Sequence, residues 1–412
     1  MTTAAINILL GADSLAEQRS GVGRVTFEVA QAMRGHAEVG ELRLVIGGRL
    51  AGAAALDLVA DGATPNGTIS SGAMLNGAGP NGMRDGRRGL RSMAARVPAL
   101  HALRQRAVRL VMDRGAGGLA GNGLPVIYYE PNMIAKPFSG ATVVTVNDMS
   151  WHGGHGYHPA DRIRWIERNL PATLRQVSRF VAISAFTRDE MARLLGVPAS
   201  RIDVVPLAPS AVFQPSSRTQ AAEALQRYGL RDRGFVLSVS TLEPRKNLDG
   251  LLAAWRALPG PVRARTPLVI AGGLGWGTVL ADPAADRLRQ SGQLRLLGHV
   301  PDADLSRLCA RCAVFAYVSL YEGFGLPVLE AMGAGAPVVA SATTGTGETA
   351  GTAALLVDPR DHAGIAAALL RVIEDAPAAN CLRRAGLAQA AAFTWARTTE
   401  LLLASWRRAL LA

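Results

Sequence analysis

Short apolar segments alternate with helical segments along most of the chain, and they form two consecutive series. In the first series we expect strands at Ile6 to Leu10, Leu42 to Ile46, Val126 to Tyr129, Thr142 to Val146, Phe180 to Ile183 and Asp203 to Val205. In the second we expect them near Phe235 and at Pro267 to Ala271, Leu294 to Leu297, Ala313 to Val318, Pro337 to Ala340 and Ala354 to Val357. Strands that alternate with helices form parallel sheets covered on both faces. The pattern therefore predicts an α/β protein with two Rossmann-like domains.

The domain boundaries follow from proline and from local composition. Three prolines lie within 206–216, which we interpret as the linker between a first domain at 1–205 and a second at 217–393, with a last helix at 394–412. Residues rich in glycine, alanine, asparagine and serine predict a flexible insertion at about 51–120. No apolar run reaches the roughly 18 residues of a membrane-spanning helix, and the first residues resemble a strand rather than a signal peptide. We therefore expect a cytoplasmic protein.

Two glutamates bracket a glycine-rich loop in the second domain. The stretch Glu322-Gly-Phe-Gly-Leu-Pro-Val-Leu-Glu330 follows an apolar strand and precedes a small-residue helix. A glycine loop at this place brings backbone amides and the positive end of a helix to a phosphorylated ligand. The carboxylates would repel phosphate, but an ionised carboxylate accepts hydrogen bonds from hydroxyl groups. The motif therefore predicts a site for a phosphate that carries sugars on both sides.

A second strand-turn-helix segment in the same domain carries two adjacent cations. It reads Ser240-Thr-Leu-Glu-Pro-Arg-Lys-Asn247, and Asn247 is the expected N-cap of the helix that follows. Lys246 is one of only two lysines, whereas the other 42 of the 44 basic residues are arginines. A lysine beside an arginine at the start of a helix suits a diphosphate. An isolated pair of this kind is also compatible with an ordinary solvated helix cap.

Together the two segments resemble the donor site of retaining glycosyltransferases with the GT-B fold, in the group also called glycosyltransferase family 4. The resemblance implies that Arg245 and Lys246 hold the donor diphosphate, that Glu330 takes the ribose hydroxyls and that Glu322 contacts the transferred sugar. It also implies that charge on the leaving phosphate is stabilised without a metal ion, and that no cofactor is needed. The remaining donor-binding residues implied are Gly21, Gly23, Ser240, Thr241, Gly272, Gly298, His299, Val300, Gly323, Phe324, Gly325 and Leu326.

The corresponding signal in the first domain follows the strand Thr142 to Val146. Asn147 and Asp148 stand where members of the family commonly have His-Asp, and asparagine neither titrates nor carries charge. We expect both at the catalytic centre together with Arg245, Lys246 and Glu322. Asp148 suits the orientation of Asn147 or of an acceptor hydroxyl, and it suits a plain turn equally well. The acceptor-site candidates on the same loop are Trp151, His152 and His158.

The net charge of +12 raises the question of an anionic partner. Nine arginines and two acids lie between Arg84 and Arg114, interleaved with apolar residues at roughly helical spacing, and Pro98 would break or kink a helix there. This segment fits a basic amphipathic surface on anionic lipid and an ordinary surface helix equally well. Nucleic acid is not expected as a partner, because no zinc-finger, helix-turn-helix or RNA-binding pattern accompanies the charge.

As a whole, the layout looks most like bacterial mannosyl- and rhamnosyltransferases of surface polysaccharide assembly. The resemblance implies retaining, metal-independent transfer of a sugar, with GDP-mannose as the first donor hypothesis. The acceptor would be a lipid-linked oligosaccharide at the inner face of the cytoplasmic membrane. Two alternatives stay open: a non-catalytic sugar-nucleotide-binding subunit of an assembly complex, which Asn147 favours, and a nucleotide-sugar epimerase on the same fold.

Overall fold

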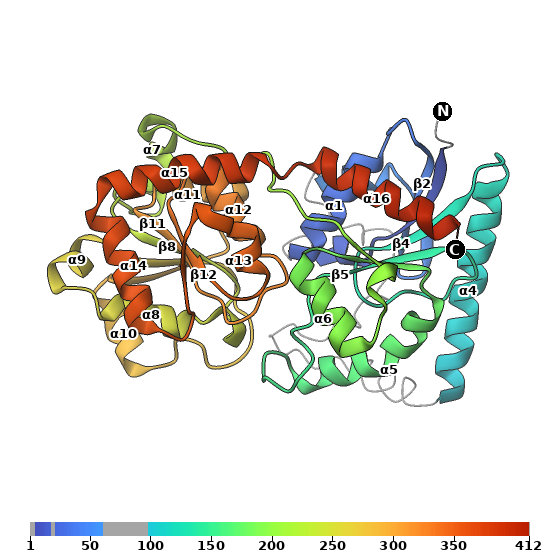
Figure 1. Cartoon of the computed structure of the whole chain (residues 1–412), viewed down its shortest axis with the longest axis horizontal. Helices are drawn as coiled ribbons and strands as arrows, with labels where there is room; N and C mark the ends of the chain where they lie inside the picture. Colours follow the sequence, from blue (N-terminus) through green and yellow to red (C-terminus); the bar gives the residue numbers. More distant parts are fainter. Residues whose placement is uncertain (1–4, 18–20, 61–97, 412) are drawn as a thin grey trace.

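The computed structural model describes residues 5–17, 21–60 and 98–411, which form two α/β domains lying side by side (Figure 1). Among these residues the first domain has a seven-stranded sheet in the order β3-β2-β1-β4-β5-β6-β7. All neighbouring strands in it run parallel except β2 and β3. The strands are β1 (Ile6–Gly11), β2 (Val39–Ile46), β3 (Arg49–Gly52), β4 (Val126–Glu130), β5 (Thr142–Val146), β6 (Arg179–Ala182) and β7 (Ile202–Val204).

Helices cover both faces of this sheet, and every residue of the central strands β1 and β5 is buried. These strands are near-continuous apolar runs because both of their faces pack against helices. The helical segments are η1 (Asp13–Glu17), α1 (Gly21–Met33), α2 (Ala55–Ala60), α4 (Pro98–Ala120), α5 (Ala160–Gln176), α6 (Ala185–Leu195) and η3 (Ala199–Arg201).

The second domain has a six-stranded, fully parallel sheet in the order β10-β9-β8-β11-β12-β13. Its strands are β8 (Val236–Val239), β9 (Leu268–Ala271), β10 (Leu294–Gly298), β11 (Val314–Tyr317), β12 (Val338–Ser341) and β13 (Leu355–Val357). Its helical segments are α7 (Arg218–Arg227), η4 (Pro244–Lys246), α8 (Leu248–Arg256), α9 (Gly260–Arg265), α10 (Pro283–Gln290), α11 (Asp302–Arg311), α12 (Leu326–Gly333), α13 (Thr344–Ala350), η5 (Gly351–Ala353), α14 (His362–Glu374) and α15 (Ala376–Ala391).

Each strand expected from the sequence is present, and the differences lie in the segment expected to be a flexible insertion. Residues 51–60 instead complete the antiparallel edge strand β3 and form α2, and residues 98–120 form the long helix α4. Pro98 does not kink that helix but begins it, at a position where the missing amide hydrogen costs no hydrogen bond. Residues 61–97, which include five of the nine arginines of the arginine-rich stretch, lie outside the described residues.

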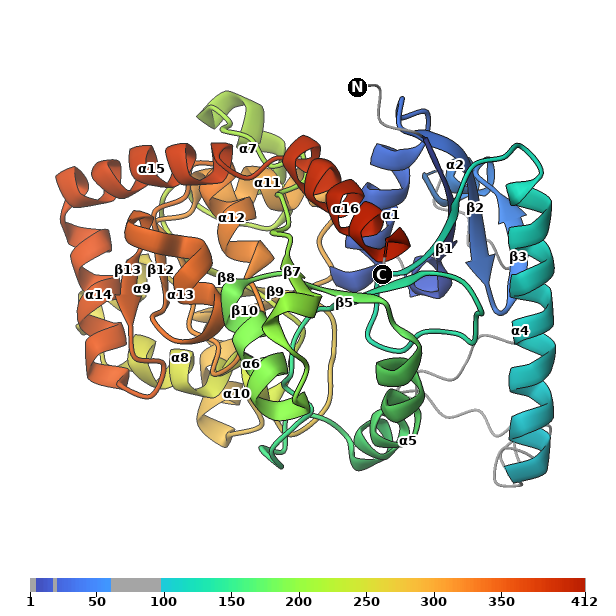
Figure 2. The ribbon, with the colours of Figure 1, turned by 45° about the vertical axis from the view of Figure 1, so that its right-hand side comes forward.

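The last helix, α16 (Trp395–Leu410), leaves the second domain and packs on the first (Figures 1 and 2). Trp406 is fully buried against Tyr129 of β4, with ring centroids 5.0 Å apart. Ser405 Oγ donates to Asp203 Oδ2 at 2.7 Å, and Thr398 Oγ1 donates to the carbonyl oxygen of Pro206 at 2.8 Å. The chain thus passes between the domains twice. None of the described helices is both long enough and apolar enough to span a bilayer.

Candidate active site

The glutamate loop connects β11 to α12 with the geometry that its sequence predicts. Gly325 precedes the helix with φ of 91°, in the left-handed region that glycine adopts without strain, and Pro327 lies in the first turn. Glu330 follows one turn into α12, where its side chain is buried. The loop therefore presents the amino end of α12 and both glutamates at the carboxyl edge of the second sheet.

Glu322 lies at the centre of a buried ionic cluster. Lys246 Nζ donates to Glu322 Oε1 at 2.6 Å, and Arg245 Nη1 donates to Glu322 Oε2 at 3.0 Å. Tyr317 Oη, at the end of β11, also donates to Glu322 Oε1 at 2.9 Å, and Lys246 donates to that hydroxyl at 3.0 Å. Arg245 Nε reaches Glu243 Oε2 at 3.1 Å. The structure thus brings together Arg245, Lys246 and Glu322 from the ends of two neighbouring strands.

Mutual attraction sets the charge of Glu322 and Arg245 in this cluster, whereas burial and the neighbouring Arg245 lower the pKa of Lys246 against the attraction of Glu322. Burial alone would raise the pKa of Glu322, but Arg245 and Lys246 lower it to about 2, so the carboxylate is ionised at neutral pH. Burial also opposes the charge of Arg245, yet Glu322, Asp148 and Glu243 raise its pKa above the ordinary value. The two cations are therefore held in place before any anionic ligand arrives.

Sequence reasoning missed two members of the cluster and misjudged one neighbour. Glu243 and Tyr317 were not singled out, although Glu243 lies two residues before Arg245 in the same motif. Asn247 does not cap α8 with its side chain as expected, because it adopts a left-handed conformation with φ of 56°. Its amide instead donates to the carbonyl oxygens of Val318 and Pro359 at 3.0 and 2.7 Å. Asn247 therefore ties the Arg-Lys turn to the end of β11.

Glycines allow the loops of the second domain to pack backbone against backbone. A Cβ atom on Gly272 would lie 1.9 Å from the carbonyl oxygen of Ser240, and the backbone there has φ of 150°. The Ser240 hydroxyl is buried and has no hydrogen-bond partner among the described residues, while Thr241 Oγ1 donates to Glu243 Oε1 at 2.6 Å. The predicted residues Ser240, Thr241 and Gly272 thus lie beside the cation cluster.

The first domain contacts the glutamate loop directly. A Cβ atom on Gly323 would lie 1.8 Å from the carbonyl oxygen of Asn147, so only glycine fits between the two backbones. Ser184 Oγ and Thr187 Oγ1, in the first turn of α6, donate to the carbonyl oxygen of Gly323 at 2.5 and 3.2 Å. Ser184 also caps α6 by accepting from Thr187 N. Nothing in the sequence indicated that this cap also reaches the other domain.

Asp148 lies next to this contact and organises the loop that follows. Its Oδ1 accepts from Ser150 N at 3.0 Å and from Ser150 Oγ at 2.6 Å, and Ser150 Oγ lies 2.7 Å from His158 Nε2. Burial and Arg162 lower the pKa of His158 to about 4, so its imidazole is neutral near pH 7. The Asn147 amide donates to the carbonyl oxygen of Pro131 at 3.2 Å. The side chain of Asp148 therefore holds Ser150 by hydrogen bonds, whereas Asn147 is held by Pro131.

The acceptor candidates differ in how accessible they are. Trp151 is 6% exposed and packs in the apolar core under β5 and β6. His152 is half-buried against Trp151, with ring centroids 5.5 Å apart. His158 lies 5.6 Å from the ring of Trp276, whose indole nitrogen donates across the domains to the carbonyl oxygen of Tyr157 at 2.8 Å.

The other predicted donor residues are spread over several elements of the two domains. Gly21 and Gly23 form the first turn of α1. Gly298, the last residue of β10, and His299 after it are exposed, whereas Val300 is buried. Phe324 is buried against Phe393, and half-buried Leu326 begins α12.

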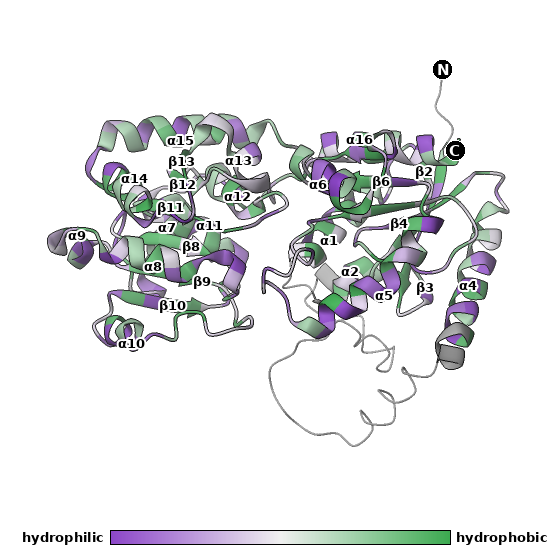
Figure 3. Ribbon diagram, turned by 60° about the horizontal axis from the view of Figure 1, so that its bottom comes forward, coloured by the Kyte–Doolittle hydropathy of each residue, from purple (hydrophilic) through white to green (hydrophobic). Residues whose placement is uncertain are grey.

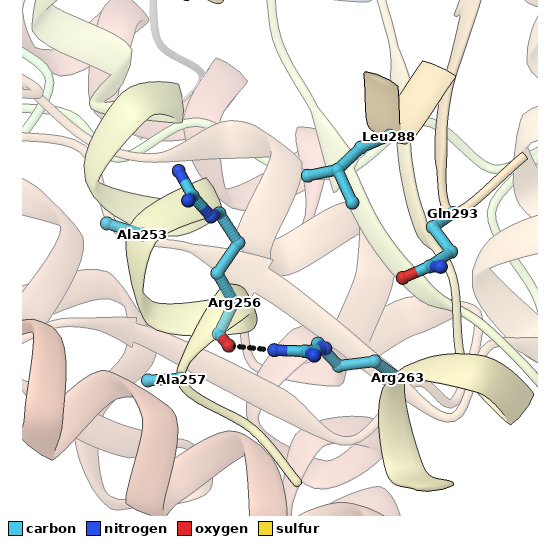
Figure 4. Close-up of a pocket in the computed structure, with 6 residues that line it drawn as sticks. All are labelled: Ala253, Arg256, Ala257, Arg263, Leu288 and Gln293. Carbon is cyan, nitrogen blue, oxygen red and sulfur yellow. Dashed lines mark hydrogen bonds between the residues drawn. The ribbon is translucent and has the colours of Figure 1, made fainter. Parts of the chain in front are cut away.

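A cavity of about 600 Å³ lies away from all these residues (Figure 4). It is lined by Ala253, Arg256, Ala257, Arg263, Leu288 and Gln293, and the Arg263 guanidinium donates to the carbonyl oxygen of Arg256. We place the site at the ionic cluster and not here, because only the cluster lies where loops from both sheets converge. Within the described part of the chain, no three His, Cys, Asp or Glu side chains are grouped so as to hold a metal ion.

Two facing Rossmann-like domains with a cationic cluster at the cleft define the class of GT-B glycosyltransferases. A family model described as glycosyl transferases group 1 matches residues 222–389, and one described as glycosyltransferase family 4 matches residues 81–208. The O-antigen chain mannosyltransferase B of Escherichia coli is 40% identical over 273 residues, which cover 66% of this chain and 72% of that protein. The chain belongs to this family of glycosyltransferases, as its motifs predict.

Further comparisons extend the relationship. The serotype-specific mannosyltransferase WbdA of Escherichia coli is 34% identical over 201 residues, which cover 46% of this chain but only 24% of WbdA. The solved structure of Anabaena HepE in complex with UDP and glucose matches with a TM-score of 0.66 at 17% identity, covering 97% of this chain and 98% of HepE. WaaG, a glycosyltransferase involved in lipopolysaccharide biosynthesis, matches with a TM-score of 0.64 at 14% identity, covering 97% and 98%. At such identities the solved structures establish the GT-B fold alone.

Proposed function

We propose that this glycosyltransferase moves mannose from GDP-mannose, with retention, to a lipid-linked oligosaccharide during assembly of a surface polysaccharide. The buried cluster of Arg245, Lys246 and Glu322 carries the proposed reaction, because it places two fixed cations at the start of a helix. The sugar and the pathway are supported by the 40% identity to the O-antigen chain mannosyltransferase B. The donor base follows from the family resemblance of the motifs.

The proposed chemistry relies on electrostatic stabilisation of the leaving group. As the bond from the sugar to the β-phosphate breaks, negative charge collects on the phosphate oxygens. Arg245 and Lys246 stabilise that charge, and they do so strongly because the cluster is shielded from water. The acceptor hydroxyl attacks the sugar from the same face as the one from which the phosphate departs. The proton of that hydroxyl passes to the departing phosphate. This course needs neither a titrating group at Asn147 nor a metal ion.

Two experiments test this function, first nucleotide binding and then sugar transfer. Thermal unfolding is measured with GDP, UDP, ADP and dTDP, and a nucleotide at 100 times its dissociation constant raises the free energy of unfolding by about 2.7 kcal/mol. We expect the largest shift with GDP, followed by mannose transfer from GDP-mannose to a synthetic polyprenyl-diphosphate-linked oligosaccharide in EDTA. A shift with UDP or dTDP alone would contradict GDP-mannose as donor, and loss of transfer in EDTA would contradict the metal-free course.

Because the proposed acceptor is linked to a lipid, the protein needs a surface that contacts the membrane, and we propose that this surface is α4. This helix stands at the end of the first domain that is remote from the second domain (Figures 2 and 3). Met112, Gly115 and Leu119 face the core, whereas Leu103 and Leu110 are 65% and 50% exposed on the opposite side. The exposed basic residues on the helix are Arg104, Arg106, Arg109 and Arg114. Apolar side chains flanked by arginines match the interface of an anionic bilayer.

Binding to lipid vesicles tests this surface. We expect the protein to sediment with vesicles that contain phosphatidylglycerol and not with purely phosphatidylcholine vesicles. Replacing both Leu103 and Leu110 with glutamate should weaken that binding about tenfold or more, through lost apolar burial and added repulsion. Leu387→Glu, at a residue 36% exposed on α15, is the control that should bind normally. Equal binding of all three proteins would exclude α4 as the membrane surface.

A non-catalytic sugar-nucleotide-binding subunit is the second candidate, favoured by Asn147 where family members commonly have histidine. The two functions share the donor site and differ in turnover. Binding of GDP without transfer, and without hydrolysis of GDP-mannose in a sensitive assay, would support the subunit and exclude the enzyme.

A further inference from the structure

One arginine of the first domain pairs with two carboxylates of the second. Arg24 lies in the first turn of α1, and its Nη1 donates to Glu330 Oε1 of α12 at 2.5 Å. Its Nη2 donates to Asp302 Oδ1, at the start of α11, at 2.7 Å. The guanidinium also lies 6.0 Å from the centre of the Phe213 ring in the linker. Arg24 therefore spans the cleft beside the hinge and holds two elements of the other domain.

The pairing with Arg24 engages one oxygen of the Glu330 carboxylate. The Glu330 side chain is 5% exposed, whereas those of Arg24 and Asp302 are 28% and 40% exposed. Within the described residues, Arg24 Nη1 donates to Oε1 of this carboxylate. Because an ionised carboxylate can accept several hydrogen bonds, Glu330 can also accept from the hydroxyl groups of a ligand. Arg24 thus orients a carboxylate that keeps capacity for a ligand.

We propose that Arg24 is a positioning residue that holds Glu330 for the donor ribose, so that the donor site is complete only when the two domains close. This inference rests on the proposed function, in which Glu330 accepts the ribose hydroxyls. The nucleotide then binds to a surface to which both domains contribute. Donor binding and domain closure consequently favour each other, because each supplies a partner that the other needs.

The charge balance around Glu330 supports the same role. Burial raises the pKa of Glu330 to about 7, and Arg24 opposes that rise. The facing groups are Arg24 and Glu28 of α1, and Asp302 and Cys309 of α11; the charges of Asp302 and Glu28 raise the pKa further. Because the ionised carboxylate accepts hydroxyl hydrogen bonds, donor binding should increase as pH rises through this pKa. Removal of the Arg24 charge should move the midpoint of that increase to higher pH.

A thermodynamic cycle that combines a protein variant with a ligand analogue, with nucleotide affinity as the measured quantity, tests the inference. GDP, or whichever nucleoside diphosphate stabilises the wild type best, is compared with its 2′,3′-dideoxy analogue by calorimetry from pH 5.5 to 8.5. In the wild type, loss of the ribose hydroxyls should weaken binding about tenfold or more, the effect of a hydrogen bond to a charged group. Arg24→Gln should weaken the binding of the natural nucleotide by a similar factor. The affinity for the dideoxy analogue should stay close to that of the wild type.

Three further proteins make the outcome decisive. Arg34 is an exposed arginine just after helix α1 that pairs with Asp57. The control variant Arg34→Gln should bind both nucleotides normally. Arg24→Lys should restore part of the preference for the ribose, and Asp302→Asn should preserve it because Glu330 keeps its partner. Equal weakening of both nucleotides by Arg24→Gln, or an unshifted pH midpoint, would overturn the role of Arg24 and leave the function standing. A wild type that binds no nucleotide would refute the function itself.

Discussion

Replacing Lys246 with alanine should lower the rate of sugar transfer by ~10²–10³-fold, the usual cost of losing one preorganised contact to a developing charge. The ammonium group lies in the buried cluster, 2.6 Å from Glu322 Oε1. Arg245 still neutralises Glu322 after the change, so we expect the fold to survive. Glu322→Ala should cause a loss of similar size. The measurement is kcat with saturating donor, beside a thermal unfolding curve.

The matched control for this change is Arg231→Ala, at an exposed cation that donates to the carbonyl oxygen of Arg265. It removes the same charge from the same domain and should transfer sugar at the wild-type rate. Near-normal turnover of folded Lys246→Ala would remove the cluster from the mechanism.

Adding a methyl group at Gly323 should slow transfer about 10–100-fold by preventing full closure of the domains. The new Cβ atom would lie 1.8 Å from the carbonyl oxygen of Asn147, and a backbone oxygen cannot rotate away as a side chain does. Overpacking at a rigid contact costs roughly 1–3 kcal/mol, which here opposes closure. We expect Gly323→Ala to lower kcat and to raise the radius of gyration of the nucleotide-bound protein in X-ray scattering.

Gly260→Ala provides the comparison, because a Cβ atom at Gly260 would meet nothing within 4 Å. Both measurements should stay at their wild-type values in that variant. If Gly323→Ala also left both unchanged, closure through the Asn147 contact would play no part in turnover.

The sequence predicted the fold well where local pattern decides the structure. The buried strands of both sheets are apolar runs bounded by turns, and each was expected. Edge strand β3 was missed because its four residues carry only one large apolar side chain, Leu50. The region of helix α4 was included in a flexible insertion although its spacing is roughly helical, because Pro98 was expected to break or kink a helix there. Met112 and Leu119 are buried, and only the three-dimensional structure shows that they form the face of the helix that packs on the domain.

At the site, the sequence predicted that residues from neighbouring strands lie together but did not predict contacts between distant segments, and the roles assigned to the residues stay predictions. Arg245, Lys246 and Glu322 meet because their strands are neighbours in a parallel sheet, which the alternating pattern implies. Arg24 and Glu330 are 306 positions apart, and no local rule relates them. Trp151 was expected near the acceptor because it follows strand β5; its indole packs largely in the core, which the sequence did not indicate, and its role stays a prediction.

The double passage of the chain between domains has a mechanical consequence. The outgoing linker and the returning helix α16 run next to each other, joined where Thr398 bonds to Pro206. Two adjacent covalent tethers form a pivot, which permits a swing about one axis and resists twisting or sliding of one domain past the other. The same loops therefore meet in the same register at every closure. Cutting the chain just before α16 would leave a single tether, and the domains would then have to find each other's orientation anew in every cycle.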